Sequence, residues 1–162
     1  MKFIRLSSFF LIMCLTTERA LCQDKENNQK AAKFYIEEVV NKQNLALINQ
    51  VFADTFLVHF LLDSTQILQT IAGQAEFLKY LFKAFPDINY SVGDVIGEGD
   101  KTAMRVTLSA THKDEFWGYK SLGKRINYLS EIFFFRFSNG KIVESWVQFD
   151  LHNLFRQLKG EK

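Results

Sequence analysis

The dipeptide Asn139-Gly140, which separates two apolar stretches, constrains the fold of this chain more than any other feature. An Asn-Gly pair in this setting is the strongest short hairpin signal, because both residues accept the positive φ angles of a tight turn. A second turn is predicted at Gly99-Asp100. The C-terminal half is therefore predicted to form consecutive strands over residues 89–98, 101–113, 125–137 and 142–150.

Helical periodicity comes before these strands. Apolar residues recur at intervals of three and four from Ala32 to Val40, which predicts an amphipathic helix. Asn44 can cap a second short helix, and a third helix after Gly73 ends at Pro86. The other expected segments are a loose lead-in at 24–30, a short strand at 56–60, a helical turn or loop at 61–72, and a last helical piece at 151–158.

Composition limits the size of the fold and its partners. The chain has 162 residues, 48% of them hydrophobic, and one proline, which predicts one compact domain with a sizeable core. Its 17 Phe residues indicate a core or cavity walled by aromatic rings. The formal net charge is +2 and no Lys/Arg stripe is interleaved with aromatics. We therefore expect no nucleic-acid partner.

The first 22 residues have the pattern of a secretory signal peptide. They combine a basic start (Lys2, Arg5), an apolar run over residues 9–15, and small residues (Ala20, Cys22) before Gln23. The apolar run is shorter than the ~20 residues that span a bilayer. Cleavage before Gln23 would give an exported protein, periplasmic or secreted. The alternatives are an acylated Cys22, an uncleaved anchor, or a cytosolic protein.

Both cysteines, Cys14 and Cys22, lie within this segment. The mature chain, residues 23–162, would be a single domain without a disulfide, a thiol nucleophile or a thiolate metal site. We expect no membrane association after signal removal.

The predicted strand over residues 125–137 is apolar on both faces, because Phe133, Phe134 and Phe135 follow one another. Helices can cover only one face of a curved sheet. We therefore expect a second copy of the chain to cover the other face, giving a homodimer.

Three phrases occur in a fixed order: Phe85-Pro86-Asp87, then Gly99-Asp100-Lys101 with Ala110-Thr111-His112, then residues 139–146 (NGKIVESW) with Asp150 and Gln157-Leu158. In this order the chain resembles the SnoaL-like polyketide cyclase (ester cyclase) family of the nuclear-transport-factor-2-like superfamily. The resemblance implies an α+β fold, a cone-shaped curved antiparallel sheet packed against N-terminal helices.

The resemblance also implies site residues. Asp150 sits where these cyclases carry an acid/base aspartate, and His112 sits at the histidine of their Gly-Thr-His phrase. The Trp146-bearing face of the last strand would look into the cavity. His59, Trp146, Tyr35 and Phe116 are the expected ligand contacts. In such cyclases the aspartate takes a proton from an activated carbon and the enolate closes a ring, which requires no metal or organic cofactor.

Each of these residues also has a structural interpretation. Asp150 can be a helix N-cap, His112 a core histidine, and His59 and Trp146 packing residues. Glu131 is either paired with Arg105 or Arg136, or has a raised pKa. Glu144 is expected to be a cross-strand ion-pair partner. A zinc site of His59, His112 and His152 has no supporting motif spacing.

The chain departs from the family pattern around the cavity mouth. Ala110 and Asp114 stand where the family has glycines, and Leu122-Gly123 replaces Thr-Gly. The family resemblance as a whole implies a cofactor-free enzyme of the cyclase, isomerase or lyase type. It would act on a small hydrophobic carbonyl compound by carboxylate-mediated proton abstraction. The alternatives are an exported non-catalytic protein that holds an apolar ligand in the cavity, and a dimerisation module whose cavity is filled by side chains.

Overall fold

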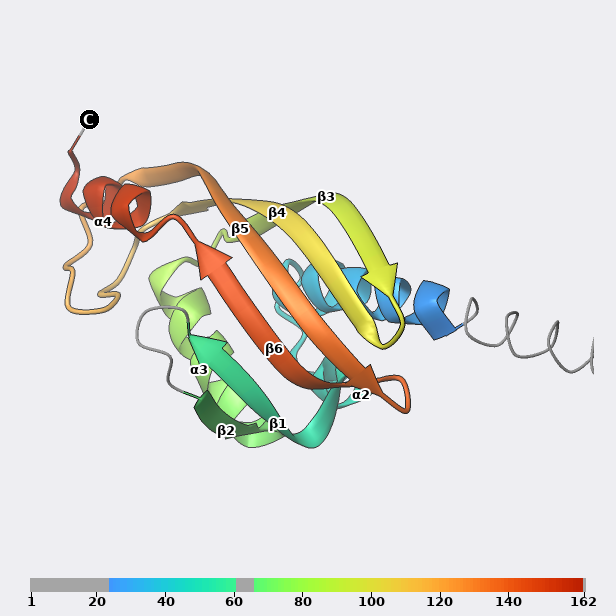
Figure 1. Cartoon of the computed structure of the whole chain (residues 1–162). Coiled ribbons are helices and arrows are strands. Elements are labelled where there is room, and N and C mark those ends of the chain that lie inside the picture. The colour runs from blue at the N-terminus through green and yellow to red at the C-terminus, as the bar shows by residue number, and fades with distance from the viewer. Residues whose placement is uncertain (1–23, 61–65, 162) are drawn as a thin grey trace, which may run out of the picture.

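The computed structural model describes residues 24–60 and 66–161, and the predicted signal segment lies outside them. These residues form one six-stranded sheet in the order β2-β1-β6-β5-β4-β3 (Figure 1). The strands are β1 (Phe52–Phe60), β2 (Gln66–Thr70), β3 (Asn89–Glu98), β4 (Lys101–Thr111), β5 (Arg125–Ser138) and β6 (Lys141–Phe149).

Neighbouring strands are antiparallel except for β1 and β6, which are parallel. Both predicted hairpins, β3–β4 and β5–β6, are confirmed. The second turns at Asn139 and Gly140, with φ of 50° and 72°. These angles suit a tight turn that follows the right-handed twist of its strands.

The helical elements are η1 (Tyr35–Val40), η2 (Leu45–Leu47), α2 (Ile48–Val51), α3 (Ile71–Ala84) and α4 (Leu151–Lys159). Residues 24–34 are also helical and run into η1, so the predicted loose lead-in was wrong. This segment buries Asn28 and Ala32 against the rest of the protein, and such packing can order a stretch of low apolar periodicity. Asn44 precedes η2, but its side chain makes no capping bond.

Helix α3 has recognisable ends. The Thr70 hydroxyl accepts a bond from the Gly73 amide at 3.1 Å, which satisfies one of the free amides of the first turn. The helix stops at Ala84, two residues before Pro86, as expected from the missing N–H of proline. Its inward face includes Leu78 and Leu81, both buried.

Strand β2 was not predicted from the sequence. Residues 61–72 were expected to be a helical turn or loop, but Gln66–Thr70 pairs antiparallel with β1 at the edge of the sheet. Most of these residues are exposed, so no apolar alternation marks the strand. Residues 61–65 lie outside the described part of the chain.

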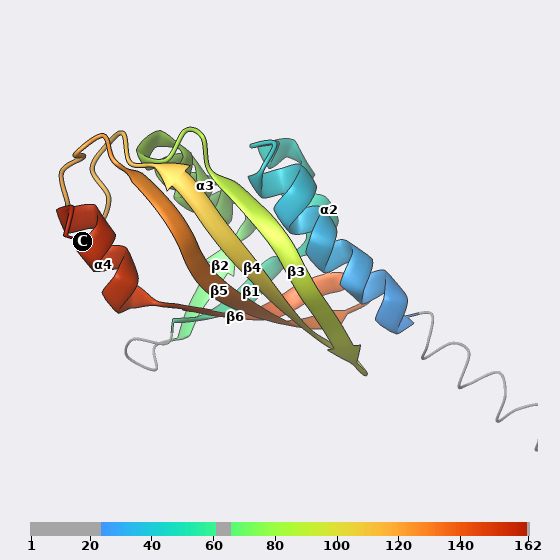
Figure 2. The same cartoon turned by 90° about the horizontal axis from the view of Figure 1, so that it is seen from above.

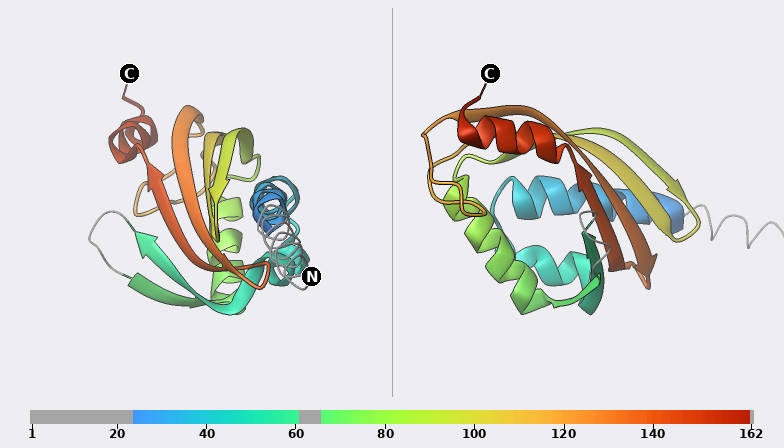
Figure 3. Two further views of the ribbon diagram at one scale, coloured as in Figure 1. Left: turned by 45° about the vertical axis from the view of Figure 1, so that its right-hand side comes forward. Right: turned by 60° about the vertical axis from the view of Figure 1, so that its left-hand side comes forward.

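The sheet curves, and η1, α2 and α3 lie on its concave side (Figure 2). Figure 3 shows the same curvature from two further directions, with α4 near the end of the sheet, where it contacts β5. Buried side chains of the helices and the concave face form one continuous core. The predicted α+β cone is therefore confirmed.

Among the helices of the described residues, none combines the length and the apolar character needed to cross a membrane.

Candidate functional site

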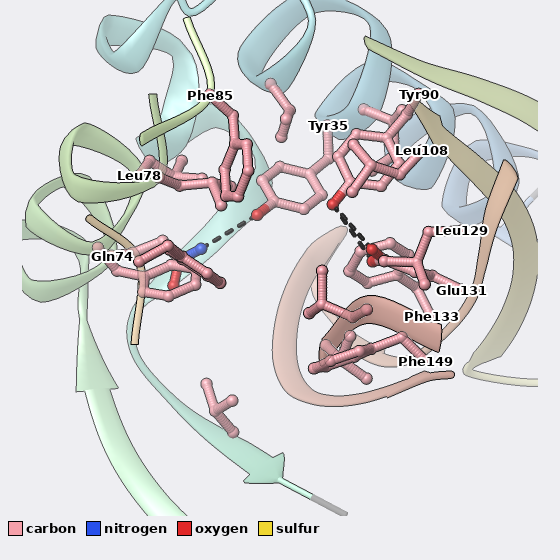
Figure 4. Close-up of a pocket in the computed structure, with 18 of the residues that line it drawn as sticks. Tyr35, Gln74, Leu78, Phe85, Tyr90, Leu108, Leu129, Glu131, Phe133 and Phe149 are labelled. Atoms are coloured by element: carbon pink, nitrogen blue, oxygen red, sulfur yellow. Dashed lines mark hydrogen bonds between the residues drawn. The ribbon is translucent and has the colours of Figure 1, made fainter. Parts of the chain in front are cut away.

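A cavity of about 320 Å³ lies between the concave face of the sheet and helices η1 and α3. Its wall is mainly aliphatic and aromatic, with contributions from Leu78, Phe85, Leu129, Phe133 and Phe149. Polar atoms enter it from four buried side chains: Tyr35, Gln74, Tyr90 and Glu131 (Figure 4). The core is therefore not filled by its own side chains, and it can hold a small ligand.

Glu131 is the carboxyl group of this cavity. It lies on β5, where alternation turns Leu129, Glu131 and Phe133 to the concave face. Its oxygens accept bonds from the Tyr90 hydroxyl at 3.2 and 3.3 Å. Burial raises the pKa of Glu131 to about 8, because an apolar surrounding disfavours the charged form, while the Tyr90 bond partly offsets this.

Two arginines could have neutralised this carboxyl group, but both are engaged elsewhere. Arg105 pairs with Asp94 at 2.8 Å, and Arg136 pairs with Glu144 at 2.7 Å. Of the alternatives left open for Glu131, an ion pair with Arg105 or Arg136 was wrong, and the raised pKa agrees with the structure.

Tyr35 and Gln74 form a second polar pair in the cavity. The Gln74 side-chain amide donates to the Tyr35 hydroxyl oxygen at 3.0 Å, so the hydroxyl proton of Tyr35 is not used in this bond. Tyr35 begins the π-helical segment η1, in which the Asn41 amide bonds to the Ile36 carbonyl five residues earlier. Such wide turns are frequent at functional sites. Burial raises the pKa of Tyr35, so the phenol stays protonated.

Tyr90 is held in place by Asn41, at the C-terminal end of η1. The Asn41 side chain donates to the Tyr90 carbonyl at 2.9 Å and accepts from the Tyr90 amide at 2.8 Å. β3 is an edge strand, so these two bonds use backbone groups that no outer strand pairs with. They fix the position from which the Tyr90 hydroxyl reaches Glu131.

Asp150 lies outside the cavity. It is exposed at the start of α4, and its carboxylate accepts from the Asn153 amide at 2.9 Å. This is the geometry of a helix N-cap. The structure therefore agrees with the capping interpretation, and it does not bring Asp150 into contact with His112.

His112 packs against Phe85 on the concave side, but it is not part of the cavity wall. It is 2% exposed, and the centroids of the two rings are 5.3 Å apart. Its Nε2 atom has no hydrogen-bond partner among the described residues. Burial lowers the pKa of His112, so the ring is neutral at pH 7.

The prediction that Trp146 looks into the cavity was wrong. Trp146 pairs with Phe134 of β5, and Phe134 lies on the convex face because its neighbours Phe133 and Phe135 face inward. Val147 and Phe149 line the cavity instead. Sequence could not decide this, since both faces of β6 carry apolar residues.

His59 also lies on the convex face, where its ring stacks on Trp146 at 4.6 Å. Its Nε2 atom is 2.6 Å from Glu144, which also accepts from Arg136 across the strand pair. The expected cross-strand role of Glu144 is confirmed, and the placement of His59 in the cavity was wrong. Within the described residues, no His, Cys, Asp and Glu side chains form a group that could hold a metal ion.

Tyr35 and Phe116 are the two predicted ligand contacts that do line the cavity. Tyr90, Gln74 and Glu131 were not among the site residues predicted from the sequence. Strand parity already turned Glu131 toward the core, and this was the available signal. Tyr90 and Gln74 had none, because only the tertiary fold brings them to their partners.

The sequence pattern of the SnoaL-like polyketide cyclase family matches residues 29–158, which is most of the chain. The chain belongs to this family. We found no significant match to this SnoaL-like protein among curated protein sequences.

Solved structures with the same fold span nearly the whole domain. A protein described as a SnoaL-like polyketide cyclase, from Jannaschia sp. CCS1, is 18% identical with a TM-score of 0.76. The match covers 85% of this chain and 95% of that protein. A protein described as a polyketide cyclase, from Acidithiobacillus ferrooxidans, is 25% identical with a TM-score of 0.74, and the match covers 84% of this chain and 96% of that protein. AclR from Streptomyces galilaeus, described as a hydroxylase, is 26% identical with a TM-score of 0.69, and the match covers 82% of this chain and 81% of AclR. The SnoaL-like fold of this chain is thus of the cyclase and hydroxylase type.

Proposed function

We propose that this SnoaL-like protein is a cofactor-free enzyme that removes a proton next to the carbonyl group of a small hydrophobic compound. Glu131 would be the base, in place of Asp150. The observation that carries the proposal is the position of Glu131 in the cavity wall, with a pKa of about 8. A base is most effective when its pKa lies near the working pH, and an ordinary carboxyl group is far too acidic.

In the proposed step the Glu131 carboxylate takes the proton from carbon, and the C–H electron pair forms the C=C bond of an enolate. The charge then develops on the former carbonyl oxygen. The Tyr35 hydroxyl can donate to that oxygen, because Gln74 already donates to the phenol oxygen and leaves its proton free. The enolate carbon can next attack a second carbonyl group or take the proton back at a new position. These outcomes are ring closure and isomerisation.

The test needs a probe that reports a base in an apolar cavity. In 5-nitrobenzisoxazole, removal of the C–H proton at carbon 3 of the isoxazole ring breaks the N–O bond and releases a coloured phenolate. We expect turnover that rises with pH about a midpoint near 8. Glu131→Gln should lower the rate by about 100-fold or more, the usual contribution of a general base.

Two matched variants serve as controls. Asp150→Asn and Glu144→Gln each remove one carboxyl group outside the cavity wall, and both should retain turnover. Full activity in Glu131→Gln, or loss of activity in Asp150→Asn alone, would contradict the proposal.

A binding protein without catalytic activity is the second candidate. It is favoured by the location of Asp150 and His112, since both family acid/base positions lie outside the cavity wall. An environment-sensitive hydrophobic dye should then bind the folded protein, while the benzisoxazole probe is not converted. Dye binding together with conversion of the probe would favour the enzyme.

A further inference from the structure

As far as the chain is described, the cavity wall contains a carboxyl group but no cationic side chain to pair with it. Among the described residues that line it, Glu131 is the only carboxyl residue, and none is Lys, Arg or His. In the described part of the chain, the Tyr90 hydroxyl is the hydrogen-bond donor that reaches its oxygens. A buried carboxylate is normally paired with a cation or bonded by several donors. Glu131 has no cationic partner among the described residues that line the cavity.

The wall around this carboxyl group favours a cation as well. The rings of Tyr35, Tyr90, Phe133 and Phe149 line the same cavity, and Figure 4 shows them around the space that Glu131 faces. The face of an aromatic ring is electrostatically negative and attracts ammonium groups, most strongly where water is excluded. A ligand ammonium group over the face of such a ring would therefore be favoured by the ring and by the carboxyl group alike.

We propose that this cavity selects its ligand by charge and binds a compact hydrophobic amine in preference to a neutral compound of the same shape. The bound amine is an ammonium paired with the Glu131 carboxylate. A hydrophobic carboxylate of the same shape is excluded, because it would lose its hydration and meet no cation. With about 320 Å³ the cavity suits a ligand of one or two rings. The inference concerns binding alone, so it does not depend on the proton abstraction proposed above.

Pairing with an ammonium ligand would change the protonation state of Glu131. In the free protein at pH 7 the Glu131 carboxyl group, with its pKa of about 8, is mainly protonated. An amine arrives from solution as its ammonium ion, so Glu131 must ionise to pair with it and one proton passes to the buffer. A group with a pKa of about 8 is about 90% protonated at pH 7, so we expect release of about 0.9 proton per ligand.

Other titratable groups do not account for such a release. The residues that face Glu131 across the cavity are Tyr90 on β3 and Tyr35 on η1, while β4, β5 and β6 contribute apolar side chains there. Burial raises the pKa of both tyrosines, so they stay protonated from pH 6 to 9. The ligand is the other possible source, since an ammonium ion that bound as the neutral amine would also release a proton. The two sources differ at pH 8, where release from Glu131, with its pKa of about 8, falls to about 0.5 proton. Release from the amine would stay near one, because the pKa of such an amine lies above 9.

The experiment is isothermal titration calorimetry at pH 7 with three ligands of similar shape: 2-naphthylmethylamine, 2-naphthylmethanol and 2-naphthoate. The amine is titrated at pH 8 as well. Each titration is made in phosphate and in Tris, whose different ionisation enthalpies give the number of protons released. We expect the amine to bind at least tenfold more tightly than the alcohol and to release about 0.9 proton. The naphthoate should show no binding.

Glu131→Gln should remove the proton release and at least tenfold of the amine affinity, with the alcohol affinity unchanged. Glu144→Gln, on the convex face, should match the wild type. Equal affinities for amine and alcohol, or no proton release from the wild-type protein, would overturn the inference. The wild-type proton counts at pH 7 and pH 8 need no variant, so their fall from about 0.9 to about 0.5 decides the question even if Glu131→Gln fails to fold. Failure of benzisoxazole turnover would leave this result intact.

Discussion

At the scale of single residues, Glu131 is the side chain whose environment departs most from its ordinary chemistry. Its place on the concave face of β5 follows from strand alternation, but its burial among rings follows from the whole cone. The raised pKa means that folding takes up a proton at neutral pH. The same feature that could make Glu131 a useful base also makes stability depend on pH.

The first prediction concerns this dependence. The pKa of Glu131 is about 8 in the folded protein and 4.5 as an ordinary side chain. Between these values the folded state binds more protons than the unfolded state, so the free energy of unfolding falls as pH rises from about 4.5 to 8. Glu131→Gln removes this loss and keeps an acceptor for Tyr90. It should be more stable than the wild type at pH 9, by up to a few kcal/mol, with the difference shrinking toward pH 5.

Urea denaturation at pH 5, 7 and 9 measures the effect. Glu144→Gln is the matched control, since its carboxyl group lies on the convex face. If wild type and Glu131→Gln gave parallel curves, Glu131 would not carry the raised pKa.

The second prediction separates capping from catalysis at Asp150. Asn accepts the Asn153 amide as Asp does, so Asp150→Asn should change stability by only a few tenths of a kcal/mol. Asp150→Ala removes the acceptor and should cost about 1 kcal/mol. Turnover of the benzisoxazole probe should be unchanged in both variants. The measurements are urea denaturation and initial rates; a rate loss in Asp150→Asn at full stability would return Asp150 to the mechanism.

At the scale of elements, the link between η1 and β3 positions the Tyr90–Glu131 pair of the cavity wall. Asn41 makes two bonds to the backbone of Tyr90, at 2.9 and 2.8 Å. Tyr90 in turn donates to Glu131 on β5, two strands away. The position of the Glu131 carboxyl group is thus tied to a residue that does not itself line the cavity.

The third prediction tests this link. Asn41→Ala removes both bonds and leaves the Tyr90 amide and carbonyl unpaired, which should cost about 1–3 kcal/mol. Asn41→Asp keeps an acceptor for the amide and should cost less. Amide hydrogen exchange at Tyr90 should quicken in Asn41→Ala, while exchange in the β5–β6 hairpin stays slow. Uniform quickening over the whole sheet would show global destabilisation and contradict a local role.

The sequence predicted elements well where local signals were strong. The Asn139-Gly140 turn and the apolar runs on either side located β5 and β6 within one residue at each end. β2 was missed because an exposed edge strand carries little apolar pattern. The inward face of β6 was assigned wrongly because Trp146 and Val147 are both apolar, and only the pairing of Trp146 with Phe134 decides between them. Register is a tertiary property, so the site residues that depend on it could not be read from periodicity.

At the scale of the whole molecule, the cone buries one face of the sheet against helices and leaves the other face open. Ile132 is 45% exposed on that convex face, beside Phe134 and Trp146. The His59–Glu144–Arg136 cluster lies on the same face and is only partly exposed. Neighbouring apolar side chains that are exposed or half-buried, with polar groups at their edge, are typical of a protein interface.

The fourth prediction is that this convex face joins two copies of the chain, as we propose from the two-sided apolar character of β5. Sedimentation equilibrium at micromolar concentration should give twice the chain mass. Ile132→Glu places a charge within the proposed contact, where burial without a partner is costly, and should give the monomer.

Leu122→Glu is the matched control, because Leu122 is 52% exposed in the segment between β4 and β5, outside the sheet, and its variant should stay dimeric. A monomeric wild type would refute the proposal, and dissociation of both variants alike would show that the effect does not depend on the convex face. The cavity is formed by one chain, so ligand binding should persist in the Ile132→Glu monomer.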